Sequence, residues 1–363
     1  MNILITNLTL SQNSGTELYV KELAQELINR GHQVEIFVLT IGKLGCELIE
    51  QNINVVNKLS RLKNIPNIIH AHHNLVTLKV AYYFKQTPIV YFIHDSISSL
   101  DHPFYHKNIM QYIAVDYNCK QRYLLNNFLE NEVKVIYNWF NPNRFKPKTQ
   151  INNIAKKALI FSNYLELNSK IYHEIKCACD ELNISLNTIG LRSGNPCNKP
   201  ELELYKYDLV FAKAKAGIES MACGCALIVC DFTGLGVMVA SANIEECRKY
   251  NFGMKLMDKP VLKNLLLNEM KKYDKEEIEK VQQFIQQQSN YYFIIDQIEQ
   301  VYQSAMEQFK QNKFGNHSFS ILNTLYILCT SIKPLIATYL LRYFPALFYN
   351  TRILYRKLFK LSK

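Results

Sequence analysis

The residues best suited to chemistry lie close together in the second half of the chain: Lys213, Lys215 and Glu219, followed by Gly234 and Gly236. Lysine neutralises phosphate oxygens, a carboxylate can accept hydrogen bonds from both hydroxyls of a ribose, and glycine permits close approach of the backbone to a ligand. Together they would suit a nucleoside diphosphate. In the structural alternative, Glu219 only favours its own helix dipole and the lysines are solvated, and the spacing alone does not decide between the two.

The surrounding sequence predicts the elements that position this set. Apolar runs at 208–212 and 226–230 indicate two strands, and helical spacing between them begins at Gly217 and ends at Gly224. On this prediction both lysines precede the helix, Glu219 lies in its first turn, and the two later glycines form a turn after the second strand. In open parallel sheets, ligands bind outside the carboxyl ends of the strands, where a helix N-terminus attracts phosphate.

The first forty residues predict the start of a doubly wound α/β domain. A strand at 2–6, a helix at 17–30 that ends at Gly31, and a strand at 34–39 follow one another. The loop at 11–16 is small and polar, so it is either an ordinary connection or a place where the backbone approaches a ligand.

Histidines follow two later strand candidates. His72 and His73 come after the strand predicted at 65–71, and His94 comes after the strand at 89–93. Imidazole is a common metal ligand, but neighbouring strand residues point to opposite faces and no cysteine or carboxylate set completes a site, so we expect no metal. In the structural alternative, each histidine is a polar strand end in a loop.

Three passages resemble the retaining GT-B glycosyltransferases of family 4. They are the opening S-G-T-E-x-x-x-x-E-L-A-x-x-L-x-x-R-G-H-x-V, the stretch 133–147, similar to V-I-x-N-G-V-D-x-x-x-F-x-P, and E-S-M-A-C-G at 219–224, similar to E-A-M-A-x-G. The resemblance covers roughly residues 1–305. It implies an α/β fold of two Rossmann-like domains facing a cleft, with the acceptor in the first and a nucleotide-diphosphate sugar as co-substrate, without a further cofactor, in the second.

The resemblance also implies roles for single residues. Glu219 would bind the donor ribose, Gly15 would lie near the donor diphosphate, and His94 would contact the donor sugar as the catalytic candidate. The remaining donor contacts would be Lys213, Lys215, Gly234 and Gly236. The acceptor cleft would be lined by His72, His73 and Asn138.

The chain departs from the family pattern at three places. A second glutamate at the donor sugar usually lies eight positions before the first, where this chain has Phe211. Trp139 replaces a glycine, and the turn at 162–164 lacks the arginine and lysine that grip the diphosphate, so Lys213 and Lys215 would carry that role. These departures keep open a protein that binds nucleotide sugar or a partner enzyme without catalysing transfer.

A sugar-nucleotide epimerase is the other alternative. It would need ionisable acid and base groups around the sugar, and His94 is the one clear candidate.

Length and periodicity divide the chain into four predicted parts. At 363 residues it exceeds what one core usually holds, and helical spacing with one apolar face runs over 275–309. With the family resemblance, which implies the role of each domain and a final helix that crosses back to the first one, we expect an acceptor domain at 1–147, a nucleotide-sugar domain at 148–290, this crossing helix at 291–310, and a basic apolar tail at 311–363.

The positive charge is concentrated in that tail. The net charge is +11, and the residues from Phe309 onward hold nine Lys or Arg and no acid, so the body is nearly neutral and a nucleic-acid partner is not expected. The apolar run 319–332 is shorter than the roughly 20 residues of a spanning helix. Apolar and aromatic residues interleaved with basic ones at 319–363 predict binding to an anionic membrane surface; a helical pair packed on the body or on a partner chain, and RNA binding, are the alternatives.

Cysteine usage and the N-terminus indicate the compartment. The ten cysteines form no Cys-x-x-Cys pair, and the first residues have only a short apolar run without a basic segment before it. We therefore expect a cytoplasmic protein. Together with the basic tail and what the family resemblance implies, this predicts a peripherally membrane-associated glycosyltransferase that moves a sugar, with retention, to a glycan or lipid-linked acceptor.

Overall fold

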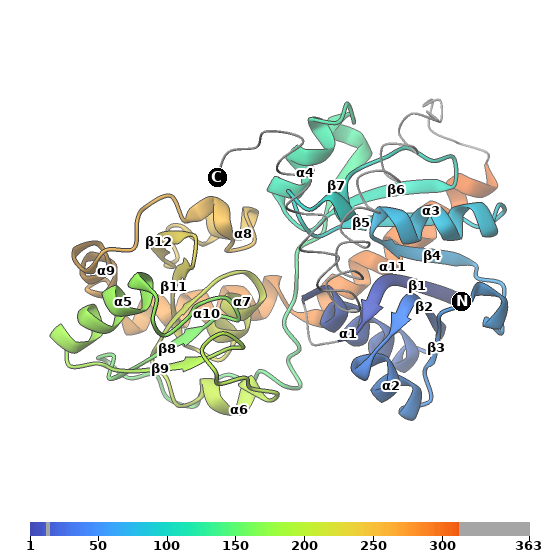
Figure 1. Cartoon of the computed structure of the whole chain (residues 1–363). Coiled ribbons are helices and arrows are strands. Elements are labelled where there is room, and N and C mark those ends of the chain that lie inside the picture. The colour runs from blue at the N-terminus through green and yellow to red at the C-terminus, as the bar shows by residue number, and fades with distance from the viewer. Residues whose placement is uncertain (12–14, 312–363) are drawn as a thin grey trace, which may run out of the picture. The chain divides into compact units, whose positions relative to one another are not determined.

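The computed structural model describes residues 1–11 and 15–311. The predicted membrane-binding segment 319–363 and residues 12–14 of the small polar loop lie outside these ranges. Within them, the chain forms two compact units (Figure 1). The first unit comprises Met1–Tyr112, Leu125–Phe128 and the described residues from Ser304, and the second comprises Ile113–Leu124 and Leu129–Gln303. No helix in the described ranges is both long and apolar enough to cross a membrane.

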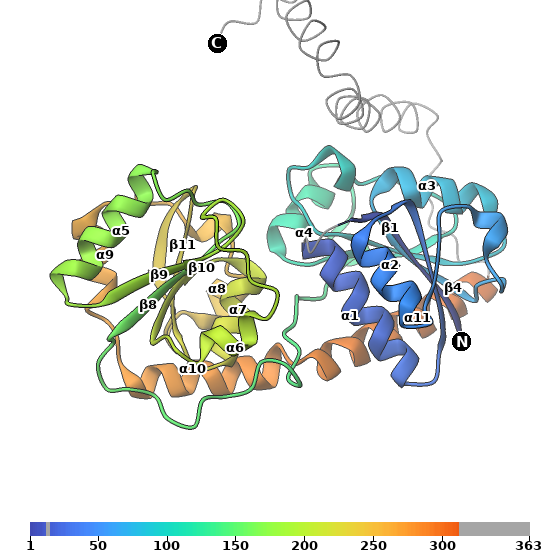
Figure 2. The ribbon, with the colours of Figure 1, turned by 60° about the horizontal axis from the view of Figure 1, so that its bottom comes forward.

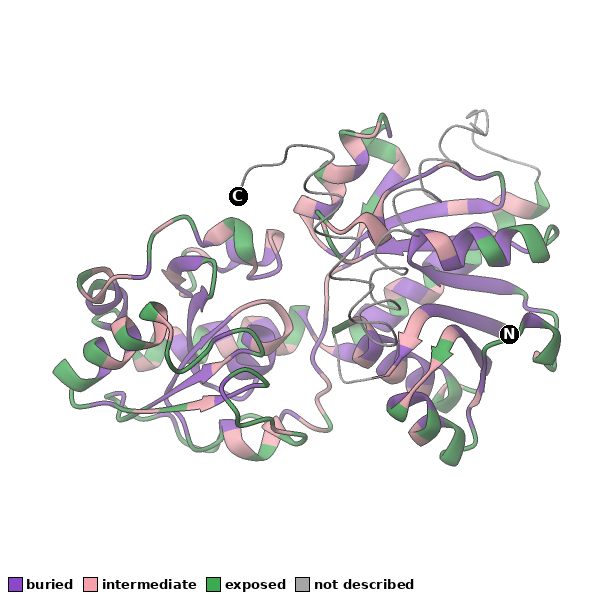
Figure 3. Ribbon diagram, viewed as in Figure 1, coloured by how far each residue is buried: buried purple, intermediate pink, exposed green. Residues whose placement is uncertain are grey.

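The first sheet has seven strands in the order β3-β2-β1-β4-β5-β6-β7. Its strands are β1 (Asn2–Leu10), β2 (Gln33–Ile41), β3 (Asn54–Val56), β4 (Ile68–His72), β5 (Ile89–Ile93), β6 (Ile109–Ala114) and β7 (Val133–Val135). The helices among them are α1 (Gly15–Asn29), α2 (Lys43–Glu50), α3 (Asn74–Tyr83) and α4 (Tyr117–Leu124). Every residue of β4 and β5 is buried, as expected for central parallel strands covered on both faces (Figure 3).

The second sheet has five strands in the order β12-β11-β10-β8-β9. They are β8 (Lys157–Phe161), β9 (Ser185–Ile189), β10 (Leu209–Ala212), β11 (Ala226–Asp231) and β12 (Gly234–Met238). The helices in this part of the chain are α5 (Lys170–Glu181), α6 (Pro200–Leu204), α7 (Ala214–Ala222), α8 (Ile244–Lys249), α9 (Lys263–Met270), α10 (Lys275–Gln288) and α11 (Tyr291–Lys310).

Successive side chains of β10 point to opposite faces of this sheet, and each face has its own hydrophobic core. Val210 and Ala212 pack with residues of α7 and α10, whereas Leu209 and Phe211 pack with residues of α5 and α9 (Figure 2). Strand residues of period two therefore face two helical layers, which is the doubly wound arrangement expected from the sequence.

Both sheets reverse their strand order beside a candidate residue. In the first sheet, β1 leads to β2 and β3 on one side, and β4 begins the other side. In the second sheet, the reversal lies between β8 and β10. Open α/β sheets bind ligands beside such reversals, at the carboxyl ends of the strands. His72 ends β4 and Lys213 follows β10, so both lie at such ends.

The predicted start of α7 was wrong. The helix begins at Ala214, so Lys215 lies inside it and Glu219 is in its second turn. The early start depends on a distant segment, because the Ala214 N–H donates to the Phe252 carbonyl at 2.9 Å and Ala214 has a φ of 48°. The spacing of apolar residues within the helix does not predict this contact.

The predicted turn at Gly234 and Gly236 was also wrong. Both residues belong to β12, which pairs antiparallel with β11, and Phe232 and Thr233 form the reversal. A Cβ at Gly236 would lie 2.7 Å from the Leu256 carbonyl oxygen, so close packing of neighbouring backbone requires glycine there.

The helical spacing over 275–309 is divided between two helices, α10 and α11, and α11 has the bounds expected for the helix at 291–310. The break occurs where Phe140 bonds to the backbone between them, donating to the Ser289 carbonyl at 3.0 Å and accepting from the Tyr291 N–H at 3.2 Å.

Candidate functional site

The predicted ribose contact, Glu219, is a buried and paired carboxylate. It is 6% exposed, and its Oε1 lies 3.4 Å from the Lys215 Nζ one helical turn earlier. Lys215 also donates to the Trp139 carbonyl at 3.1 Å. Trp139, which stands where the family pattern has glycine, is itself buried and anchors this lysine through its backbone. The structure therefore joins Lys215 and Glu219 into one pair.

Lys213 belongs to a second charge network. Its Nζ lies 3.0 Å from Asp231 Oδ2, and the Ser162 hydroxyl donates to Asp231 Oδ1 at 2.5 Å. The ring centroids of Tyr164 and Phe232 lie 5.0 and 4.6 Å from the same Nζ. These groups converge from the ends of β8, β10 and β11, which is where a sheet of this topology binds ligands.

Sequence reasoning missed Asp231. Its signal was an acidic residue directly after the apolar run 226–230, at the carboxyl end of a parallel strand. The consequence is electrostatic, because Asp231 and Glu219 balance the charges of Lys213 and Lys215. A diphosphate that binds here must compete with these carboxylates for the ammonium groups.

The position eight residues before Glu219 is a core position. Phe211 lies inside β10, is completely buried, and packs among apolar side chains. Because β10 ends at Ala212 and α7 begins at Ala214, Lys213 alone connects them. This connection holds no carboxylate for a donor sugar.

The predicted histidines of the first unit fall into two groups. His94 Nε2 lies 2.9 Å from His72 Nδ1, and the ring centroid of Tyr19 is 4.7 Å from that of His94. His73 instead faces Asp101, with its Nδ1 3.2 Å from Oδ1. Asp101 also accepts from the backbone N–H of His94 at 2.9 Å, which fixes the start of the loop after β5.

Burial governs the protonation of this cluster. It lowers the pKa of His94 to about 4, with Asp101 opposing the shift, and it lowers the pKa values of His70 and His72 well below the ordinary value. Burial opposes ionisation of Asp101, yet the hydrogen bond and charge of His73 hold the pKa of Asp101 below its usual value. At neutral pH, His70, His72 and His94 are therefore uncharged.

The remaining predicted residues lie at element ends. Gly15 begins α1, and a Cβ there would meet no described atom within 4 Å, so packing does not require glycine. Asn138 follows β7 and is half-buried. Gly234 approaches backbone carbonyls, with a Cβ 2.8 Å from the Met257 oxygen. Among the described residues, no three His, Cys, Asp or Glu side chains are arranged to hold a metal ion.

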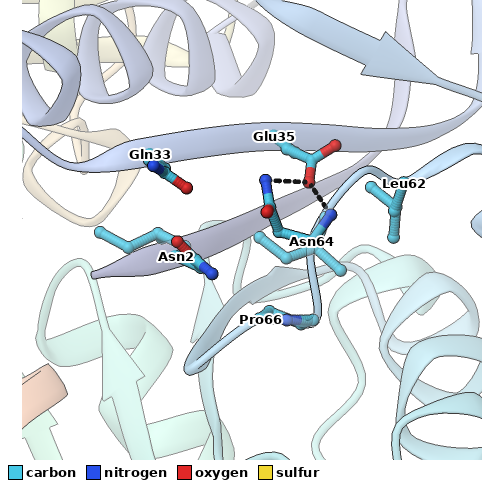
Figure 4. Close-up of a pocket in the computed structure, with 8 residues that line it drawn as sticks. Asn2, Gln33, Glu35, Leu62, Asn64 and Pro66 are labelled. Atoms are coloured by element: carbon cyan, nitrogen blue, oxygen red, sulfur yellow. Dashed lines mark hydrogen bonds between the residues drawn. The ribbon is translucent and has the colours of Figure 1, made fainter.

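Two cavities lie away from these groups. A small one at the amino ends of β1 and β2 is lined by Glu35, Asn64 and their neighbours (Figure 4). Glu35 accepts from the backbone N–H groups of Lys63 and Asn64, each at 2.9 Å. Glu35 thus holds a loop in place. A groove of about 550 Å³ runs along α4, β7 and α11, and none of the predicted site residues lines it.

Residues 13–144 match the family Glycosyltransferase Family 4. No match was found among curated proteins.

Solved structures cover most of the chain. Anabaena Alr3699/HepE in complex with UDP and glucose is 14% identical, with a TM-score of 0.58 over 83% of this chain and 99% of that one. A glycosyltransferase from Rickettsia africae ESF-5 is 14% identical, with a TM-score of 0.57 over 84% of this chain and 98% of that one. Sucrose-phosphate synthase from Thermosynechococcus elongatus is 12% identical, with a TM-score of 0.52 over 83% of this chain and 98% of that one.

The two doubly wound units and these structural likenesses define the fold as GT-B. The match of residues 13–144 to Glycosyltransferase Family 4 agrees with the family resemblance noted in the sequence. The α/β, GT-B fold, the family resemblance and the enzyme class predicted from the sequence are thereby confirmed.

Proposed function

We propose that the chain transfers a sugar from a nucleotide-diphosphate sugar whose nucleotide binds at the carboxyl edge of the second sheet, with no further cofactor. The observation that carries the proposal is Glu219, a buried carboxylate held by Lys215 on the helix that follows β10. A carboxylate fixed in this place can accept from both ribose hydroxyls. The Anabaena HepE structures, solved with UDP and with UDP-glucose, support uridine nucleotides as the first ligands to test.

The diphosphate would draw on Lys213. Its ammonium is paired with Asp231, so a phosphate oxygen replaces a carboxylate oxygen as its partner when the donor binds. The affinity for a bare diphosphate should then be modest, because one charge-assisted bond is exchanged for another. We propose His94 as the contact to the sugar that is transferred.

The acceptor and the location are further parts of the proposal. We propose a glycan or lipid-linked acceptor, contacted by His72, His73 and Asn138, and transfer with retention at the cytoplasmic face of a membrane. The support for a membrane is the charge of the tail, since the residues from Phe309 onward carry nine basic side chains and no acid.

One observation favours a second function. Phe211 is a core residue and the β10–α7 connection holds no acid, so the donor-sugar carboxylate of the family pattern has no counterpart there. A protein that binds nucleotide sugar without transferring it would fit this feature.

The test of the donor site is a thermal-shift panel of nucleoside diphosphates and their sugars. We expect uridine nucleotides to raise the melting temperature of the wild type and of Glu245→Ala, an exposed control, but not that of Glu219→Ala. No rise with any nucleotide in the wild type would contradict the proposal. Hydrolysis or transfer of any bound nucleotide sugar would exclude the binding-only function.

The proposed binding to a membrane is tested separately. The wild type should sediment with vesicles that contain an anionic lipid and stay in solution with neutral vesicles. Deletion of 319–363 should abolish sedimentation, and a truncated chain that still sediments would contradict this part alone.

A further inference from the structure

His72 and His94 are joined by one hydrogen bond, so only one of the two nitrogens that face each other carries a proton. His94 Nε2 and His72 Nδ1 are 2.9 Å apart, and both rings are neutral at pH 7. Either His94 donates from Nε2, or His72 donates from Nδ1. The two arrangements leave His94 Nδ1 as an acceptor or as a donor, respectively.

The surroundings of His72 decide between the two. The residue is completely buried, and its Nε2 has no hydrogen-bond partner among the described residues. The neighbouring rings are aromatic: centroids of Tyr19, His70 and Phe92 lie 5.3, 4.6 and 6.0 Å from that of His72. If His94 donated, the proton of His72 would sit on this Nε2 as a buried N–H without an acceptor. Buried N–H groups without partners are rarer than buried acceptors with a spare lone pair.

The backbone holds His72 in this orientation. Its N–H donates to Thr6 Oγ1 at 3.2 Å, so the end of β4 is tied to β1. His94 is held separately, because its N–H donates to Asp101. His94 is only half-buried, and its Nδ1 bonds to none of the described residues, which leaves that nitrogen for a ligand.

We infer that His72 is a positioning residue whose Nδ1–H donates to Nε2 of His94 and thereby sets His94 as the tautomer that carries its proton on Nδ1. His94 then offers a neutral N–H donor to an oxygen acceptor such as a sugar hydroxyl. The choice of a sugar as ligand rests on the proposed function, but the tautomer does not. In this state His94 cannot accept a proton at Nδ1, so it is a hydrogen-bond donor and not the base that an epimerase would need.

The tautomer is measured directly on the full chain. The protein is labelled with ¹⁵N-histidine, and correlations between ring nitrogens and carbon-bound ring protons at pH 7 show which nitrogen is protonated. The signals of His94 and His72 are assigned from the His94→Gln and His72→Asn variants. We expect a protonated Nδ1 and an unprotonated Nε2 in His94. A protonated Nε2 in His94 would overturn the inference.

Two variants of His72 distinguish the effect of losing its hydrogen-bond donor from the effect of changing its packing. The amide of His72→Asn can keep a donor near the Nδ1 position, whereas His72→Phe fills the space without one. We expect His94 to stay mostly Nδ1-protonated in the first and to become a mixture in the second. An exposed control, His173→Asn, should change nothing. A His94 tautomer unchanged in a folded His72→Phe would also overturn the inference, and if that variant does not fold, the wild-type spectrum still decides.

Kinetics extend the test to the proposed reaction. If nucleotide sugar is turned over, His72→Phe should lower kcat/KM roughly five-fold, the value of about one hydrogen bond, and His72→Asn should restore most of it. Equal loss in both variants would contradict positioning. If no nucleotide sugar is turned over, the proposed function fails while the tautomer result stands by itself.

Discussion

Substitution of Asp231 tests most directly how carboxylates at the carboxyl edge of the second sheet neutralise the lysines there. In Asp231→Ala, Lys213 loses its carboxylate partner at 3.0 Å and Ser162 loses its acceptor at 2.5 Å. The side chain of Lys213 is 18% exposed and that of Asp231 is 1% exposed, so water replaces the lost partner poorly. Removing one member of a buried pair costs about 3–5 kcal/mol.

Two aromatic rings near Lys213 reduce this loss of stability. The Tyr164 and Phe232 centroids stay within 5.0 Å of the Lys213 Nζ, and a cation–π contact contributes about 0.5–2 kcal/mol. We therefore expect Asp231→Ala to lower the free energy of unfolding by about 3 kcal/mol. For a unit of this size that is a drop in Tm of roughly 6–12 °C. Asp231→Asn keeps an oxygen acceptor and should lose about half as much.

The Asp231→Asn substitution should also strengthen nucleotide binding. Because it removes the competing charge, Lys213 is available to phosphate, and the affinity for a uridine diphosphate should rise about ten-fold, the effect of about 1.4 kcal/mol. Thermal unfolding and isothermal titration measure the two effects. Asp258→Ala, at an exposed position in the same unit, is the control. Unchanged stability together with weaker nucleotide binding would refute the reasoning, since Asp231 would then be a direct ligand contact.

Three further predictions concern residues of the two units. Gly236→Ala should lower the free energy of unfolding by about 2 kcal/mol, because its Cβ would lie 2.7 Å from the Leu256 oxygen, and should leave nucleotide affinity unchanged; thermal unfolding and titration check both. Phe211→Glu should destabilise by more than about 3 kcal/mol and restore no donor contact, because it buries a carboxylate in the core; recovery of soluble protein and its Tm test this. His94 has a folded pKa of about 4 against 6.5 when unfolded, so the unfolded chain binds more protons between these values and stability falls as pH drops from 6.5 to 4, by about 3 kcal/mol for this residue. A Tm series against pH should be less steep in His94→Gln, while the buried His70 and His72 keep their own contribution.

The sequence alone determined the fold class and most of the elements. The apolar run at 89–93 corresponds to β5, Ile89–Ile93, and the helix expected at 17–30 corresponds to α1, Gly15–Asn29. These predictions succeed because the apolar residues of one element repeat within that element, so the information is local. The family motifs are local in the same way, since each is a run of neighbouring residues.

Only the tertiary structure decided the features made by distant partners. Ala214 starts α7 early because it bonds to Phe252, and the helix pair α10–α11 is broken where Phe140 intrudes. Lys213 is paired with Asp231, which lies eighteen positions further along the chain. No local pattern carries such contacts, because strand order, not sequence neighbourhood, sets which ends of strands meet.

The histidines show the same division within one site. Their positions at the ends of two strands were readable from the sequence, since each follows an apolar run. Their partners were not, because these depend on what each ring faces: His73 meets Asp101, whereas His72 meets His94. A residue type and a strand end follow from local order, but the partners depend on the tertiary structure: neighbouring strands β4 and β5 bring His72 and His94 together, and the loop after β5 brings Asp101 to His73.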